Sequence, residues 1–126
     1  MGRIGLNQGT YPLLSAEETL AFGKAAVSLL PKDCVLALSG DLGAGKTTFV
    51  QGLAEGLGIV EPIQSPTFVL LNLYKGLSHF DLYRLKRASD FISLGFDEYF
   101  EKEGICCIEW PDRIADILPP ETVYIH

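Results

Sequence analysis

One glycine-rich segment constrains this chain more than any other feature of its sequence. Residues 40–48, GDLGAGKTT, match the pattern G-x-x-x-x-G-K-[ST] at every fixed position. A continuous apolar run at 34–38 precedes the segment, and apolar residues at helical spacing follow it. This order predicts a buried strand, a loop, and a helix from about Lys46 to Leu57, which is the setting of a phosphate-binding loop.

The residue types of this segment explain how it would bind phosphate. Glycines let the backbone approach phosphate oxygens closely, so several amides can point inward, and the positive end of the next helix adds to the attraction. Lys46 can reach the β- and γ-phosphates, and the Thr47 hydroxyl can bind Mg²⁺. A glycine-rich turn with a solvated lysine is the alternative. The predicted nucleotide-binding residues here are Asp41, Leu42, Gly43, Ala44, Gly45, Lys46, Thr47 and Thr48.

Two acidic residues follow strand-like runs and are candidates for binding the metal or the attacking water. Four apolar residues lead directly into Glu109, and P-loop proteins carry such an acid at the end of a hydrophobic strand. Asp81 closes the strand that begins at Leu77 and is the second candidate. The alternatives are an ion pair of Glu109 with a surface Lys or Arg, and a turn in which Asp81 binds local amides.

Three further residues near these positions each allow two interpretations. Thr67 can supply a hydroxyl to Mg²⁺ or to the terminal phosphate, or it can belong to a plain turn at Ser65-Pro66. His79 shares a strand face with Asp81, and a packed or hydrogen-bonded strand histidine is favoured over a catalytic one. Trp110 either packs against the fold or contacts a partner.

The remaining sequence predicts strands that alternate with helices. A capping box at Ser15–Glu18 begins a first helix, which Pro31 ends. Later strands are predicted at 67–74, 77–82, 105–109 and 122–125, and helical segments at 89–102, broken near Gly95, and at 112–118. The first two of these strands should form a hairpin. The alternation indicates an α/β fold in which at least part of the sheet is parallel.

Length and composition limit the function classes. The 126 residues suit a single domain, 1–126, that begins with an extended segment at 1–14. A net charge of −6 argues against a direct grip on a nucleic-acid backbone. No apolar run approaches the ~18 residues of a membrane span and no secretory signal is present, so we expect a cytoplasmic protein. Cys34, Cys106 and Cys107 are expected to be buried and free.

Four motifs, in this order and spacing, closely resemble the TsaE family. They are GDLGAGKTT at 40–48, SPTF at 65–68, HFDLYRL at 79–85 and EWP at 109–111. TsaE proteins are small bacterial P-loop ATPases of the tRNA threonylcarbamoyladenosine (t6A) pathway. The resemblance implies a P-loop NTPase-like three-layer α/β sandwich with a mixed, mostly parallel sheet. It also implies ATP and Mg²⁺ as cofactors, slow hydrolysis alone, and TsaD and TsaB as partner proteins.

The same resemblance assigns roles to individual residues by motif position. Lys46 would bind phosphate, and Thr47 and Glu109 would bind Mg²⁺. Asp81 would lie near the nucleotide and be needed for hydrolysis, and Thr67 would respond to the nucleotide as a switch residue. Asp81, Lys46 and Thr67 are thus the expected catalytic residues. TsaD would carry out the transfer to adenosine 37 of tRNA, and this chain would drive or reset the complex without strong tRNA binding of its own.

The sequence departs from the TsaE family at its C-terminal end. The chain ends at His126, where family members usually continue through a further strand, so we expect weaker base affinity if that strand contributes to the pocket.

A P-loop kinase for a small molecule is the first alternative function. The second is a nucleotide-dependent assembly module that needs no turnover.

Overall fold

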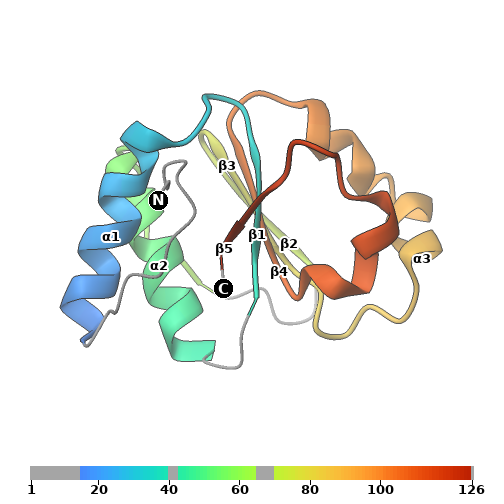
Figure 1. Cartoon of the computed structure of the whole chain (residues 1–126), viewed down its shortest axis with the longest axis horizontal. Coiled ribbons are helices and arrows are strands. Elements are labelled where there is room, and N and C mark those ends of the chain that lie inside the picture. Colours follow the sequence, from blue (N-terminus) through green and yellow to red (C-terminus); the bar gives the residue numbers. More distant parts are fainter. Residues whose placement is uncertain (1–14, 40–42, 65–69, 126) are drawn as a thin grey trace. The chain divides into compact units, whose positions relative to one another are not determined.

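The structure, a computed structural model, describes residues 15–39, 43–64 and 70–125 (Figure 1). These residues form two units, one from 15–31 and 43–64 and the other from 32–39 and 70–125. The first unit is a pair of helices, and the second is a five-stranded sheet with short helices. The segment at 1–14 lies outside the described residues, and the single domain stays a prediction.

Helix α1 spans Ala16–Leu29 and has the predicted start and end. The Ser15 hydroxyl oxygen accepts a hydrogen bond from the amide of Glu18 at 3.1 Å, so Ser15 is the N-cap. At the other end, the amide of Leu30 donates to Ala26 O at 2.9 Å before Pro31 stops the helix. Among the described residues, no helix has the length and apolar character that crossing a membrane requires.

Helix α2 spans Gly43–Gly56 and begins three residues earlier than the predicted start at Lys46. The predicted start was wrong: glycine has a low helix propensity, but tertiary context overrides it here. The helix ends at Gly56, one residue before the predicted end at Leu57, and Gly58 follows with a left-handed φ of 80° that suits glycine. Residues 43–45, which are half of the loop predicted at 40–45, therefore belong to the first turn of α2.

The two helices of the first unit contact each other through glycine backbones (Figure 1). A Cβ atom added to Gly23 would lie 3.1 Å from Cα of Gly52, and one added to Gly52 would lie 3.0 Å from Cα of Gly23. A Cβ on Gly56 would meet the carbonyl oxygen of Lys24 at 2.8 Å. No side chain fits between the helices at these points, so this close approach depends on glycine.

The second unit contains one mixed sheet with strand order β2-β3-β4-β1-β5. The strands span Val35–Leu38 (β1), Leu71–Tyr74 (β2), Leu77–Asp81 (β3), Ile105–Glu109 (β4) and Val123–Ile125 (β5). The pairs β1–β4, β1–β5 and β3–β4 are parallel, and only the β2–β3 hairpin is antiparallel. The predicted mixed, mostly parallel sheet is confirmed. Strand β2 begins at Leu71 because Leu70 lies in a bend, although the Leu70 carbonyl still accepts from the amide of Asp81.

Short helices pack on one face of this sheet and form its core. They are α3 (Ala88–Ser93) and the 3₁₀ helices η1 (Phe96–Glu101) and η2 (Pro111–Ile117). The break predicted near Gly95 is confirmed, since Gly95 has a φ of 78°. The buried cluster consists of Val35, Phe80, Leu82, Leu85, Phe91, Cys106, Ile108 and Ile114. The ring centroids of Phe80 and Phe91 lie 5.2 Å apart, and each buried ring contributes roughly 1.5–3 kcal/mol.

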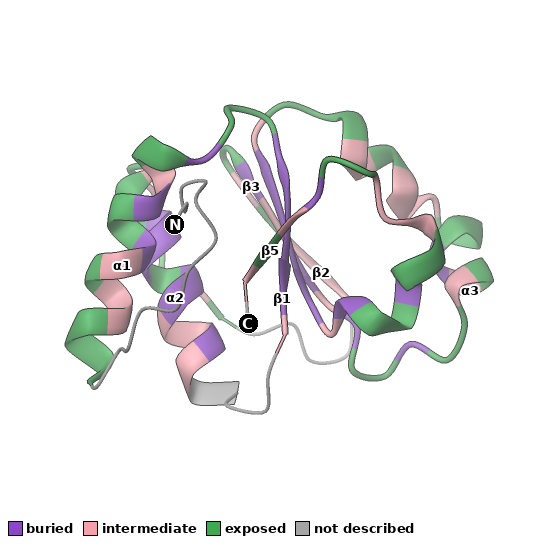
Figure 2. Ribbon diagram, viewed as in Figure 1, coloured by how far each residue is buried: buried purple, intermediate pink, exposed green. Residues whose placement is uncertain are grey.

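Strand residues alternate between the two faces of the sheet, so the other face carries a different set of side chains. Leu36, Leu38, Cys107, His79 and Glu109 lie on it and are all buried (Figure 2). Glu109 is the register partner of both Leu38 on β1 and Asp81 on β3. This second face therefore brings polar side chains into a buried setting at one edge of the sheet.

The three cysteines are buried and free, as predicted. Burial raises the pKa of Cys34 from the ordinary 9.0 to about 11, and it raises the pKa of Cys106 to about 12. The pKa of Cys107 is raised well above 9.0, first by burial and then by the nearby Glu109 carboxylate. These thiols stay protonated at neutral pH and lack the thiolate character that reactivity requires.

The helix contact predicts that Gly52→Ala destabilises the protein by about 1–3 kcal/mol, because the new methyl group meets the backbone of α1. The steric cost should exceed the gain of up to about 1 kcal/mol that alanine normally brings to a helix. Urea denaturation followed by circular dichroism measures the difference. Gln51→Ala, at the neighbouring exposed position, is the control and should leave stability nearly unchanged. Wild-type stability in Gly52→Ala would contradict the close backbone approach.

The raised cysteine pKa values predict that stability falls in alkaline solution. Unfolded thiols lose protons above pH 9.0, whereas folded Cys106 and Cys107 keep theirs, so the unfolded state binds fewer protons. The free energy of unfolding should fall by up to about 1.4 kcal/mol per pH unit for each thiol between roughly pH 9 and pH 11. Denaturation curves across this range measure the slope. Cys106→Ala should give a shallower slope, and equal slopes would refute the contribution of Cys106.

Candidate functional site

The glycine-rich segment is described from Gly43 onwards, within the first turns of α2. The first amides of a helix have no acceptor within the helix, which makes this end suitable for an anion. Lys46 lies in this part of α2 and is 8% exposed. That burial contradicts the alternative of a solvated lysine. Asp41, Leu42 and Thr67 lie outside the described residues, so their roles stay predictions.

The carboxyl ends of β3 and β4 place the two predicted acids side by side. Asp81 and Glu109 are register partners on adjacent parallel strands, and both are the last residues of their strands. Strand β1 ends at Leu38, which is the register partner of Glu109 on its other side. The segment that leads into the phosphate loop therefore leaves the sheet directly beside Glu109.

Glu109 forms a buried hydrogen bond that the sequence did not predict. Its Oε2 atom lies 2.7 Å from Nε2 of His79, and the two side chains are 5% and 0% exposed. This contact overturns the alternative in which Glu109 pairs with a surface Lys or Arg. It confirms that His79 is a hydrogen-bonded strand residue. A carboxylate accepts, so we assign the proton to Nε2 of His79.

Asp81 makes a local contact at the end of β3. Its Oδ1 atom accepts a hydrogen bond from the amide of Tyr83 at 3.1 Å, and the residue is half-buried. This is the turn that the sequence offered as the alternative role. The bond fixes the carboxylate at the end of its strand, beside Glu109. A role in catalysis stays a prediction for Asp81, and the turn is compatible with it.

The chain turns sharply immediately after Glu109. Trp110 has a φ of 61° and is the one non-glycine residue with positive φ among the described residues. Such a conformation costs an aromatic residue roughly 1–2 kcal/mol, and strain of this kind is common at functional sites. The Trp110 ring packs on the core cluster, with its centroid 5.1 Å from that of Tyr83. The packing interpretation of Trp110 is therefore confirmed.

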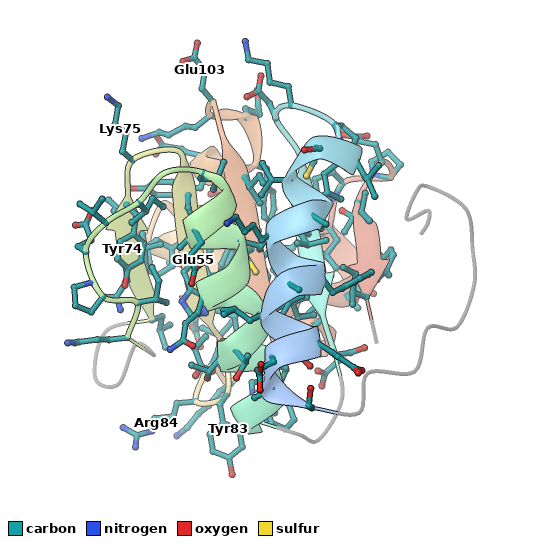
Figure 3. All side chains as sticks on the ribbon, turned by 90° about the vertical axis from the view of Figure 1, so that its left-hand side faces the viewer. Glu55, Tyr74, Lys75, Tyr83, Arg84 and Glu103 are labelled. Atoms are coloured by element: carbon teal, nitrogen blue, oxygen red, sulfur yellow. The ribbon has the colours of Figure 1, made fainter. Side chains whose placement is uncertain are left out.

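Tyr83 and Arg84 follow the acidic end of β3 and point outward from the sheet unit (Figure 3). Tyr83 is 58% exposed even though it contacts the Trp110 ring. Arg84 is also exposed. Tyr83 and Arg84 therefore place one exposed aromatic and one exposed cationic side chain next to the edge that carries Asp81 and Glu109.

Asp81 and Glu109 are the residues of this edge that could hold a metal ion, because both carry carboxylate oxygens. Among the described residues, no group of three or more His, Cys, Asp or Glu side chains could hold a metal ion. Mg²⁺ prefers oxygen ligands, keeps several waters, and is usually bound by one or two carboxylates together with substrate phosphates. Asp81 and Glu109 end neighbouring strands as register partners, so each could supply one such carboxylate.

Sequence reasoning missed the pairing of His79 with Glu109, although it named both residues. The signal that could have found it is the spacing of His79 and Asp81, two residues apart at the end of a strand. Once β3 and β4 are aligned in parallel with Asp81 beside Glu109, His79 lies diagonally opposite Glu109. The parallel alignment of β3 with β4 cannot be predicted from the sequence alone.

The fold and the site together define a P-loop NTPase-like α/β protein. A buried parallel strand leads into a G-x-x-x-x-G-K-T segment, a helix begins within that segment, and an acid ends the neighbouring strand.

Comparisons with known proteins identify the family. A model described as "Threonylcarbamoyl adenosine biosynthesis protein TsaE" matches residues 13–126. The tRNA threonylcarbamoyladenosine biosynthesis protein TsaE of Treponema pallidum is 48% identical over 114 residues, which cover 88% of this chain and 84% of the relative. The protein of the same name from Bacillus subtilis is 42% identical over 124 residues, covering 95% and 77%. The chain belongs to the TsaE family, as its four motifs indicated.

A solved structure supports the same assignment. The crystal structure of YdiB from Bacillus subtilis matches with a TM-score of 0.74 and 40% sequence identity. The match covers 90% of this chain and 71% of that one. The α/β fold expected from the sequence is therefore shared with a solved relative.

Proposed function

We propose that this chain is a cytoplasmic Mg²⁺-dependent ATPase that acts in t6A formation on tRNA together with TsaD and TsaB. Membership of the TsaE family supports a role in t6A biosynthesis. The observation that carries the ATPase assignment is the acidic pair, Asp81 and Glu109, which lies beside the strand leading into the phosphate-binding motif. Hydrolysis would drive or reset the complex.

In this mechanism Glu109 acts on both the metal and the water, and Lys46, Thr47 and Asp81 each have one task. The amides at the start of α2 and the Lys46 ammonium group would bind and orient the phosphates, and the Thr47 hydroxyl and Glu109 carboxylate would hold Mg²⁺. When bound, Mg²⁺ neutralises charge that develops on the phosphate oxygens. Asp81 and Glu109 would orient a water molecule, whose oxygen bonds to the γ-phosphorus while the bond to the β–γ bridging oxygen breaks, and a proton of that water passes to solvent. The products are ADP and inorganic phosphate.

The charge of the chain supports a division of labour with its proposed partners. A net charge of −6 is unfavourable for binding a phosphate backbone. We therefore assign tRNA binding and the transfer to adenosine 37 to the partner complex, and nucleotide turnover to this chain.

One experiment separates this function from its alternatives. Phosphate release from ATP is measured with the chain alone and after addition of TsaB, TsaD and both. Stimulation by the partners supports the proposal. Nucleotide binding without phosphate release in any mixture would instead favour the assembly module, and transfer of the γ-phosphate to an acceptor other than water would favour the kinase.

Lys46→Ala should lower nucleotide affinity by at least about tenfold, roughly 1.4 kcal/mol, because the phosphates lose a buried cation. Titration with a fluorescent nucleotide measures the affinity. Lys32→Ala, which removes an exposed lysine of the other unit, is the matched control and should bind normally. If Lys46→Ala binds as tightly as the wild type, the phosphate-loop assignment is wrong.

Glu109→Ala and Asp81→Ala should act on turnover more than on nucleotide affinity. Affinity comes mainly from amides and Lys46, whereas the acids act on charge that develops in the transition state. Each variant should lower partner-stimulated hydrolysis at least about tenfold, roughly 1.4 kcal/mol of barrier. Glu109→Ala should lose more of its Mg²⁺ dependence than Asp81→Ala.

The control for these variants is Glu103→Ala. Glu103 is an exposed acid in the loop before β4, at the other end of that strand (Figure 3). Its removal changes the net charge by the same amount as the other two and should leave turnover unchanged. Wild-type turnover in either Asp81→Ala or Glu109→Ala would remove that residue from the catalytic site.

A further inference from the structure

We propose that His79 is a positioning residue for ATP hydrolysis, which holds one carboxylate oxygen of Glu109 and thereby orients the other. The proposal rests on the function proposed above, in which Glu109 acts on Mg²⁺ and water. His79 itself would contact neither nucleotide nor metal. Its effect passes entirely through Glu109.

The geometry follows from the parallel pairing of β3 and β4. His79 is the register partner of Cys107, and Glu109 lies two residues further along the same face of β4. The His79 side chain crosses this diagonal and brings Nε2 to 2.7 Å from Oε2 of Glu109. The side chains are 0% and 5% exposed, so bulk water competes little for this bond.

The donor and the acceptor of the hydrogen bond between His79 and Glu109 follow from the chemistry of the two groups. With the carboxylate ionised, Nε2–H of His79 donates to Oε2, and Oε1 remains for a metal or a water molecule. Nδ1 of His79 is buried and has no hydrogen-bond partner among the described residues. Within that part of the chain, the Glu109 bond is thus the one hydrogen bond that orients the ring. Ligating carboxylates in metal sites are commonly held by such outer hydrogen bonds.

Stability alone is a poor explanation for this pair. On the same face the pair has three buried apolar neighbours, Leu36, Leu38 and Cys107. Its register partners Asn72 and Asp81 are polar and only half-buried. Burying a polar pair costs desolvation energy, and well-packed apolar residues in its place are often equally stable or better. A histidine at this position is therefore better explained by what it does to Glu109 than by what it contributes to the core.

Two substitutions of His79 separate positioning from packing. His79→Leu fills the space without a donor, and His79→Gln places an amide nitrogen near the position of Nε2. We expect His79→Leu to lower the kcat of partner-stimulated hydrolysis at least about tenfold, with the KM for ATP within about threefold of wild type. His79→Gln should recover most of the lost kcat.

Phe91→Leu is the control for loss of stability. Phe91 is fully buried in the core cluster on the opposite face and does not touch the pair. Its substitution should reduce stability while kcat stays close to wild type. If His79→Leu and Phe91→Leu lower kcat in proportion to their loss of stability, or if His79→Gln is no better than His79→Leu, the positioning role is refuted.

A second measurement needs neither nucleotide nor metal. The chain has two histidines, His79 and His126, so nitrogen NMR of labelled histidine rings is easily assigned with the His79→Leu variant. The His79 ring should carry a proton on Nε2, and that proton should exchange slowly with water. Glu109→Ala should abolish the slow exchange. A ring protonated on Nδ1 alone, or a rapidly exchanging Nε2 proton, would refute the pair.

The outcomes distinguish this inference from the function on which it rests. If Glu109→Ala loses turnover and His79→Leu does not, the inference fails and the ATPase assignment stands. If the wild type with both partners hydrolyses no ATP, the proposed function fails and so does the role of His79 in turnover. The NMR measurement then still decides whether the pair exists in solution.

Discussion

The parallel pairing of β4 with β3 and β1 is the constraint on which the rest of the site depends. Parallel strands direct their carboxyl ends to one edge, so the last residues of β3 and β4 meet there and β1 ends beside them. Reversing any of these strands would move its terminal residue to the other edge. The acidic pair, the diagonal from His79 to Glu109, and the exit of the chain towards the phosphate motif all follow from this alignment.

The two faces of the sheet have different tasks. One face carries Phe80, Ile108 and the rest of the aromatic core, which is packed under short helices and supplies much of the hydrophobic stabilisation of the sheet unit. The other face carries His79, Glu109 and Asp81, together with buried apolar residues such as Leu36, Leu38 and Cys107. Successive side chains of a strand point to opposite faces of the sheet. One strand can therefore supply the hydrophobic core with every second residue and the candidate site with the residues between them.

Much of this arrangement could be predicted from the sequence, because it depends on local patterns. Apolar runs located the strands, the Ser15 cap and Pro31 located α1, and four motifs identified the family. The strand order and the His79–Glu109 bond could not be predicted, since they depend on which strands pair and in what register. The start of α2 was misplaced because glycine propensity is a weak guide in a packed context. Thr67, Asp41 and Leu42 stay predictions, because they lie outside the described residues.

The contact between Gly23 and Gly52 also limits how this protein can evolve. A Cβ atom at either glycine would meet the backbone of the other helix, and no second substitution can remove backbone atoms. A larger residue at one position therefore has no compensating change at its opposite position, unlike a core pair in which a large and a small side chain can exchange places. The two positions are expected to change last as lineages diverge, so they would mark distant relatives in which the surrounding helix surfaces have become unrecognisable.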